Sequence, residues 1–332
     1  MLKINNLEYK IDDFHLKINN LKINNNSIHC ILGNSGAGKT TLLNLIAGHL
    51  NPKRGKILLE EKNINNLKPY KRNIGLIFQD SLLFPNMNVF ENIAYSLKVK
   101  KLNKEKIKNK VQSWLKKIDL VGFENRMPSE LSGGEKKRVT IARTLINEPQ
   151  FILMDEPFNS LDPDLKKQML NLITKLKNNT KVGIIYITHS FEDALKISDN
   201  ISVLENGQII HSGNPEKLIL EPENLSITKF FNYYNNTKIN IKDNFFKLYG
   251  QKIKLDKSGS FNCIILPQAF TLYKDGTFKI LKRIILKYGY IYKIKFKNTF
   301  FYAFSTKQFN IRQKIDYKIN KNYIIFKQEE KC

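Results

Sequence analysis

A glycine-rich octapeptide between an apolar run and a helix-forming run constrains this chain more than any other feature. The apolar run Ile28–Leu32 predicts a buried strand that ends at Gly33. After the octapeptide, the sequence from Thr41 to Ala47 favours a helix that stops at Gly48. A strand, a glycine-rich loop and a helix in this order predict an α/β domain whose backbone N–H groups surround a phosphate.

The side chains of this loop suit the phosphates of a nucleotide. Glycines let the backbone approach phosphate oxygens and adopt dihedrals that other residues avoid. The helix that follows adds the positive end of its dipole. We expect Lys39 to reach the β- and γ-phosphates and the Thr40 hydroxyl to join the shell of a Mg²⁺ ion. The predicted ATP-binding residues of this segment are Gly33, Asn34, Ser35, Gly36, Ala37, Gly38, Lys39, Thr40 and Thr41.

An acidic pair ends a second apolar run, Phe151–Met154. An isolated carboxylate at the end of a buried strand is costly unless a cation lies near it. A magnesium-linked role for Asp155 removes that cost. Glu156, one residue further, is placed to act as the general base that polarises the attacking water.

Two more predicted strands end in polar side chains. His189 follows the apolar run from Ile184 to Thr188, and Gln79 follows the run from Ile74 to Phe78. Ligands of open α/β sheets bind at the carboxyl ends of the strands. The sequence therefore predicts a catalytic set and a magnesium set at one edge of the sheet: Glu156, His189, Gln79 and Lys39 for catalysis, and Thr40, Gln79 and Asp155 for the metal.

The organisation of the 332 residues favours two domains. We expect an ATP-binding domain over residues 1–231, with a helical insertion at about 88–145 where strand-like runs are missing. A linker at 232–240 then leads to a small β domain over 241–332. Within these domains, Asn206-Gly207 and Asp275-Gly276 each predict a turn between two strands.

Composition limits the class of protein. No apolar stretch approaches the roughly 20 residues of a membrane span, and the amino terminus has no apolar core of signal-peptide type. Cys30, Cys263 and Cys332 lie far apart, without metal-ligand spacing. The net charge of +25 fits either a drift towards Lys, Asn and Ile along the whole chain or a basic surface that meets anionic lipid or nucleic acid.

The pentapeptide Leu131–Glu135, LSGGE, lies between the loop and the acidic pair. With these motifs, residues 1–220 resemble the ATP-binding subunits of ABC transporters of the importer type. The resemblance implies a P-loop ATPase fold and a head-to-tail homodimer that encloses two ATP molecules. It implies Gln79 and His189 as the Q-loop and switch residues and Asp162 in the D-loop at the dimer interface. The residues expected to contact the γ-phosphate held by the opposite subunit are Ser132, Gly133, Gly134 and Glu135.

Two further features follow the same resemblance. Tyr9 is the candidate for the aromatic ring that stacks on adenine, although a core tyrosine fits this position equally well. Residues 77–85 with Val89–Ile93 resemble importer subunits that receive a coupling helix from a separate permease. An apolar strip, Leu82, Leu83, Phe84 and Met87, suits such a groove, and burial against the helical insertion is the alternative.

The carboxyl-terminal part resembles the small OB-like regulatory domains, called TOBE or MOP, of molybdate, sulfate, iron and polyamine importer ATPases. The resemblance implies an ATP-hydrolysing importer subunit, peripheral on the cytoplasmic face of the membrane. Its partners are permeases and, indirectly, a solute-binding protein, and no nucleic acid is expected. The alternatives are an ATPase of an exporter or of lipoprotein release, and a soluble ABC ATPase that acts on nucleic acid or ribosomes.

Overall fold

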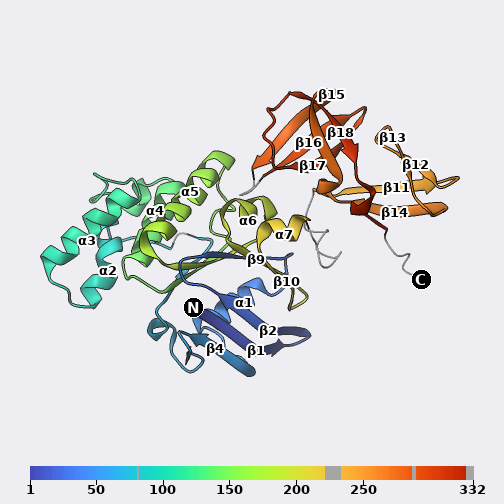
Figure 1. The fold of residues 1–332 in the computed structure, drawn as a ribbon. Helices are drawn as coiled ribbons and strands as arrows, with labels where there is room; N and C mark the ends of the chain where they lie inside the picture. Colours follow the sequence, from blue (N-terminus) through green and yellow to red (C-terminus); the bar gives the residue numbers. More distant parts are fainter. Residues whose placement is uncertain (81, 221–232, 286–288, 327–332) are drawn as a thin grey trace. The chain divides into compact units, whose positions relative to one another are not determined.

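The computed structural model describes residues 1–80, 82–220, 233–285 and 289–326 (Figure 1). The chain forms two compact units, Met1–Pro215 and Glu216–Cys332. Parts of the predicted domain 1–231, of the predicted linker and Cys332 lie outside the described residues. No helix in the described part is long and apolar enough to cross a membrane.

A 10-stranded sheet is the centre of the first unit, in the order β5-β4-β1-β2-β10-β9-β3-β8-β7-β6. Strands β9, β3, β8, β7 and β6 are parallel to one another, and β2, β1, β4 and β5 form consecutive antiparallel pairs. Between these two groups, β10 pairs antiparallel with β9 and parallel with β2. The parallel strands are apolar and buried, as expected for strands covered on both faces. The strands are β1 Leu2–Ile11, β2 Phe14–Ile23, β3 Ile28–Leu32, β4 Arg54–Leu59, β5 Lys62–Asn63, β6 Ile74–Ile77, β7 Phe151–Asp155, β8 Gly183–Thr188, β9 Asn200–Glu205 and β10 Gln208–Gly213.

Helices flank this sheet, and three of them occupy the range predicted for the helical insertion (Figure 1). Side-chain caps define where these three begin, because Asn88, Asn103 and Ser132 each accept a hydrogen bond from the backbone of the first turn. The helices are α1 Lys39–Ala47, α2 Val89–Val99, α3 Lys104–Lys117, α4 Gly133–Leu145, α5 Pro163–Thr180, α6 Phe191–Ile197 and α7 Pro215–Leu220.

The turn predicted at Asn206-Gly207 is confirmed. Strands β9 and β10 pair antiparallel around it, with Gln208 opposite Glu205. Asn206 has φ 47° and Gly207 has φ 74°, the left-handed pair that a tight two-residue hairpin requires. Cys30 is buried in β3, where it packs as a small apolar side chain.

Helix α7 lies at the start of the second unit, and from Asn235 onward its described part is built of strands and short 3-10 turns, as the sequence predicts. Its three sheets have the orders β11-β14-β19, β12-β13 and β17-β16-β15-β18, and they enclose an aromatic core that includes Phe270, Phe301 and Tyr317. The strands are β11 Asn235–Ile241, β12 Phe245–Leu248, β13 Gln251–Lys254, β14 Gly259–Ile265, β15 Phe270–Ile285, β16 Tyr290–Phe296, β17 Thr299–Ser305, β18 Lys314–Ile319 and β19 Ile324–Phe326.

One local prediction in this unit is wrong. Asp275-Gly276 does not turn the chain, because β15 continues through it with a bulge opposite Ile315. Gly276 passes so close to β18 that a Cβ there would lie 2.2 Å from backbone atoms of Ile315 and Asp316. Strand β11 begins within the range 232–240 expected for the linker, and its Ile239 and Ile241 alternate into the core.

Candidate functional site

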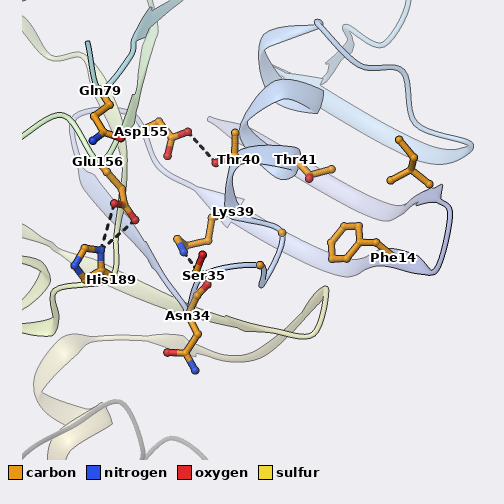
Figure 2. A pocket seen from close by; sticks show the side chains of 13 residues that line it. Phe14, Asn34, Ser35, Lys39, Thr40, Thr41, Gln79, Asp155, Glu156 and His189 are labelled. Atoms are coloured by element: carbon orange, nitrogen blue, oxygen red, sulfur yellow. Dashed lines mark hydrogen bonds and ion pairs between the residues drawn. The ribbon is translucent and has the colours of Figure 1, made fainter. Parts of the chain in front are cut away.

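The parallel order of four strands brings the predicted site residues to one edge of the sheet. Strands β3, β8, β7 and β6 are neighbours with a common direction, so their carboxyl ends meet. A cavity of about 930 Å³ lies there (Figure 2). It is lined by Ile11, Phe14, Asn34, Ser35, Gly36, Gly38, Lys39, Thr40, Thr41, Gln79, Asp155, Glu156 and His189.

The glycine-rich loop has the backbone that the sequence analysis expects of a phosphate-binding loop. Gly36 and Gly38 have φ of 79° and 102°, which other residues rarely adopt. A Cβ on Gly33 would lie 2.4 Å from the Leu204 carbonyl oxygen, so only glycine fits there. The Lys39 side chain is buried, and its Nζ donates to the carbonyls of Gly33 and Asn34, each at 2.9 Å. Burial lowers the pKa of Lys39, while Glu156 and Asp155 oppose this shift.

Oxygen donors from three elements meet beside the loop. Thr40 Oγ1, at the start of α1, donates to Asp155 Oδ2 at the end of β7 over 2.9 Å (Figure 2). Burial raises the pKa of Asp155, and the hydrogen bond from Thr40 acts against it. Gln79 lines the same cavity. A hydroxyl, a carboxylate and an amide oxygen are the hard donors that Mg²⁺ prefers, and the usual Mg²⁺ site takes only one or two protein carboxylates. The donor set therefore fits Mg²⁺.

Glu156 and His189 face each other across the ends of β7 and β8 (Figure 2). Nδ1 of His189 lies 3.2 Å from both carboxylate oxygens of Glu156. Glu156 has φ 44°, a left-handed conformation that is unusual for this residue type. Asn159 holds the same carboxylate, because its Nδ2 donates to Glu156 Oε2. Asn159 is not predictable from the sequence, because its contact with Glu156 depends on a loop conformation that no pattern in the sequence encodes.

The apolar wall of the cavity differs from the prediction. Phe14 and Ile11 line the cavity, and Tyr9 does not. Tyr9 is partly buried and packs against the core of the first unit, the second of the two interpretations that the sequence allows. Phe14 lies directly over the loop, since a Cβ on Gly38 would be 2.6 Å from its ring. Phe14, the first residue of β2, is the phenyl side chain of this cavity wall.

The LSGGE residues are not part of this cavity. Ser132 caps α4 by accepting from Glu135 N, and Glu135 Oε2 accepts from Ser132 N at 2.7 Å, which together form a capping box. These hydrogen bonds hold the pKa of Glu135 below its usual value. Gly134 packs against α5, where a Cβ would meet Leu165 Cδ2 at 2.8 Å, whereas a Cβ on Gly133 would meet nothing within 4 Å. None of these residues lines the cavity of its own chain.

The remaining sequence candidates lie outside the cavity. Asp162 is the N-cap of α5, and its Oδ1 accepts from the backbone N–H groups of Asp164 and Leu165. In the apolar strip, Leu82 is 61% exposed and Phe84 is 37% exposed, and Leu83 and Met87 are half-buried. The strip is therefore accessible rather than covered by the helices at 88–145. Ser81 beside it lies outside the described residues.

Comparison with known proteins places these features in a family. The family model described as ABC transporter matches residues 16–159. The spermidine/putrescine import ATP-binding protein PotA of Acetivibrio thermocellus is 39% identical over 287 residues, which are 84% of this chain and 82% of that protein. PotA of Clostridium acetobutylicum is 33% identical over 349 residues, with 100% and 97% coverage. The Fe(3+) ions import ATP-binding protein FbpC of Fusobacterium nucleatum is 36% identical, with 83% and 76% coverage.

Two solved structures resemble the first unit in sequence and fold. CbiO1 of Clostridium perfringens, part of the ABC transporter complex cbiONQ, has a TM-score of 0.63 and 32% identity over 67% of this chain and 91% of that chain. A dimeric ATP-binding cassette in a post-hydrolysis state, bound to ADP and Pi, has a TM-score of 0.56 and 29% identity over 65% and 99%.

Proposed function

This chain belongs to the family of ATP-binding subunits of ABC importers, and from that premise we propose that two copies form a head-to-tail homodimer around two ATP molecules. The chain is an ATPase of this family. The dimer is proposed because the LSGGE segment is separated from the cavity within one chain. Lys39, Glu156 and His189 share a cavity, whereas Ser132–Glu135 lie outside it. A signature segment that contacts the nucleotide must then come from a second copy.

The residues at and beside the cavity have proposed roles in ATP hydrolysis. The loop backbone and Lys39 bind and orient the phosphates, and Lys39 stabilises the charge that develops on them. Glu156 accepts a proton from the attacking water, and His189 and Asn159 fix the carboxylate for that role. Thr40, Asp155 and Gln79 would hold a Mg²⁺ ion, which would supply positive charge beside the phosphates. Phe14, rather than Tyr9, offers its ring to the base.

In the proposed dimer, Ser132, Gly133, Gly134 and Glu135 meet the γ-phosphate on the partner's loop. Ser132 stands at the amino end of α4, where the helix dipole favours an anion. Asp162 lies at the same interface by resemblance, and its capping of α5 fixes that loop in shape. The similarity to a dimeric ATP-binding cassette supports this arrangement.

The partner in the membrane is a permease, since importer ATP-binding subunits work with transmembrane subunits. We place its docking site at the exposed strip around Leu82 and Phe84. An apolar surface of this kind fits one face of an amphipathic helix. The protein then acts as a peripheral subunit on the cytoplasmic face of the membrane, with a solute-binding protein as an indirect partner.

We propose polyamines as the transported solute, with iron(III) as the second candidate. The relative that covers this chain from end to end is named for spermidine/putrescine import, and the FbpC relative is named for Fe(3+) ions. In cells that make this chain and its permease, Lys39→Ala should abolish uptake of labelled spermidine and leave uptake of ⁵⁵Fe(III) unchanged. Loss of iron uptake alone would move the assignment to iron.

The dimer and the general base are tested together with Glu156→Gln. The glutamine keeps the shape of the side chain and removes its basicity, so ATP stays bound and the dimer persists. Size-exclusion chromatography with MgATP should show a dimer for the variant and a monomer without nucleotide. Normal hydrolysis by Glu156→Gln would refute the assignment of the base, and a monomer at all nucleotide concentrations would refute the dimer.

A further inference from the structure

Helix α4 carries a buried lysine that bonds to the backbone of the predicted Q-loop. Lys137 is 5% exposed, and its Nζ donates to the carbonyl oxygen of Gln79. Burial lowers the pKa of Lys137, and the negative charge of Asp80 opposes that shift. Gln79 lines the cavity. Ser132 is the N-cap of α4, about a turn and a half before Lys137 on the same helix. Lys137 thus connects the LSGGE helix to the cavity wall within one chain.

A second cation of α4 bonds further along the same loop. Arg143 Nη2 donates to the Leu82 carbonyl over 2.5 Å, and its guanidinium lies 5.0 Å from the Phe84 ring. Nη1 of Arg143 is 3.5 Å from Oδ1 of Asn92, a fully buried side chain that also accepts from Phe84 N. Arg143 therefore holds the exposed strip in place through two contacts, with the backbone carbonyl of Leu82 and with the ring of Phe84.

Both cations donate hydrogen bonds to uncharged acceptors. Within the described part of the chain, neither Lys137 nor Arg143 makes an ion pair. Desolvating a cation costs free energy that an apolar side chain of similar size avoids. What the two cations provide instead is a fixed position for two carbonyls on the loop between β6 and α2.

We propose that Lys137 and Arg143 are positioning residues that tie the LSGGE helix to Gln79 and to the permease-facing strip, so that these three parts move as one body. The inference rests on the proposed function of Gln79 and of the strip. Lys137 acts on hydrolysis through Gln79, and Arg143 acts on docking through Leu82 and Phe84. A shift of α4 towards a nucleotide on the partner subunit then moves the cavity wall and the docking strip of its own chain.

The test for Lys137 is a double-mutant cycle on the full-length chain. Lys137→Met removes the donor and keeps the length of the side chain, and we expect kcat to fall about tenfold while KM for ATP stays within about twofold. Because Lys137 acts through Gln79, Lys137→Met should cause no further loss in a Gln79→Ala background. Lys137→Arg should restore most of the rate, and Lys167→Met, at an exposed lysine of α5, serves as the control.

Hydrogen exchange supplies a readout that does not depend on activity. Backbone amides of the peptide that contains Gln79 to Phe84 should exchange faster in Lys137→Met and in Arg143→Met, and at the wild-type rate in Lys167→Met. Equal exchange in all variants, or losses in kcat that multiply in the Gln79→Ala background, would overturn the proposal. If the wild-type chain itself fails to hydrolyse ATP, the proposed function fails instead, and the two failures are distinguishable.

Discussion

The edge of the sheet and the amino end of α4 both carry residues assigned to ATP, but they are built differently. At the sheet edge, Lys39, Asp155 and Glu156 face a cavity of about 930 Å³ and bond to groups from other elements. At α4, Ser132 and Glu135 satisfy each other in a capping box and do not line this cavity of their own chain. In the proposed dimer, one half of the site is preformed within a chain, and the other is a stable helix end supplied by the partner.

The largest expected effect is at the preformed half. Lys39→Ala removes the one lysine that lines the cavity, and we expect hydrolysis to fall about a thousandfold, because a preorganised charge is worth most where water is excluded. ATP binding should weaken as well, which fluorescence of a labelled nucleotide measures. Lys53→Ala, at an exposed lysine, is the control and should leave both unchanged. Normal turnover by the Lys39→Ala chain would contradict the role of Lys39 in the preformed half of the site.

Ser132→Asp separates the two properties of the helix end. Aspartate caps a helix as well as serine does, so the melting temperature should stay near that of the wild type. A carboxylate facing the γ-phosphate should nevertheless lower kcat about a hundredfold through charge repulsion, with ATP binding retained. Calorimetry and steady-state kinetics on one sample decide this. Wild-type turnover would show that the helix end only caps α4.

Acid should weaken the sheet more than α4. His29 of β3 is buried, and its Nε2 bonds to Ser202 Oγ at 2.7 Å; burial lowers its pKa to about 4. A histidine with a lowered folded-state pKa stabilises the fold above its unfolded pKa of about 6.5, and that contribution is lost as pH falls towards 4. At pH 5 the loss is about 2 kcal/mol. Urea unfolding of the wild type should show this slope and His29→Gln should not. An equal slope in both would assign it to other groups.

The smallest effect distinguishes two adjacent glycines of α4. Gly134→Ala places a Cβ against Leu165, and we expect a loss of about 1 kcal/mol in unfolding free energy through overpacking. Gly133→Ala meets nothing within 4 Å, and alanine favours a helix, so this variant should be neutral or slightly stabilising. Chemical denaturation of the pair measures the difference. Equal stability would show that α4 does not pack closely on α5.

The site residues at the sheet edge were predictable because of their positions relative to the apolar runs in the sequence. Gln79, Asp155 and His189 each follow an apolar run, Lys39 ends the glycine-rich loop that follows another such run, and parallel strands bring such ends together. The hairpin at Asn206-Gly207 was predictable for a similar reason, since both residues tolerate a positive φ.

Other features depend on contacts that a linear pattern does not contain. Tyr9 and Phe14 both precede the loop in sequence, and only the pairing of β1 with β2 decides which of them lines the cavity. Asp275-Gly276 has the residues of a turn, yet tertiary pairing with β18 makes it a bulge. Lys137 bonds to Gln79, which is distant in the sequence, and Asn159 bonds to Glu156 only through the conformation of their common loop, so neither stood out in the sequence.

Mixing two inactive variants tests the composite site most directly. A Lys39→Ala chain and a Ser132→Asp chain are each expected to be inactive alone. In a head-to-tail heterodimer, the intact loop of the second chain meets the intact LSGGE segment of the first, so one complete site forms. The mixture should therefore recover up to about a quarter of the wild-type rate, given random pairing of the chains. Activity that stays at the level of the separate variants would contradict a site shared between two subunits.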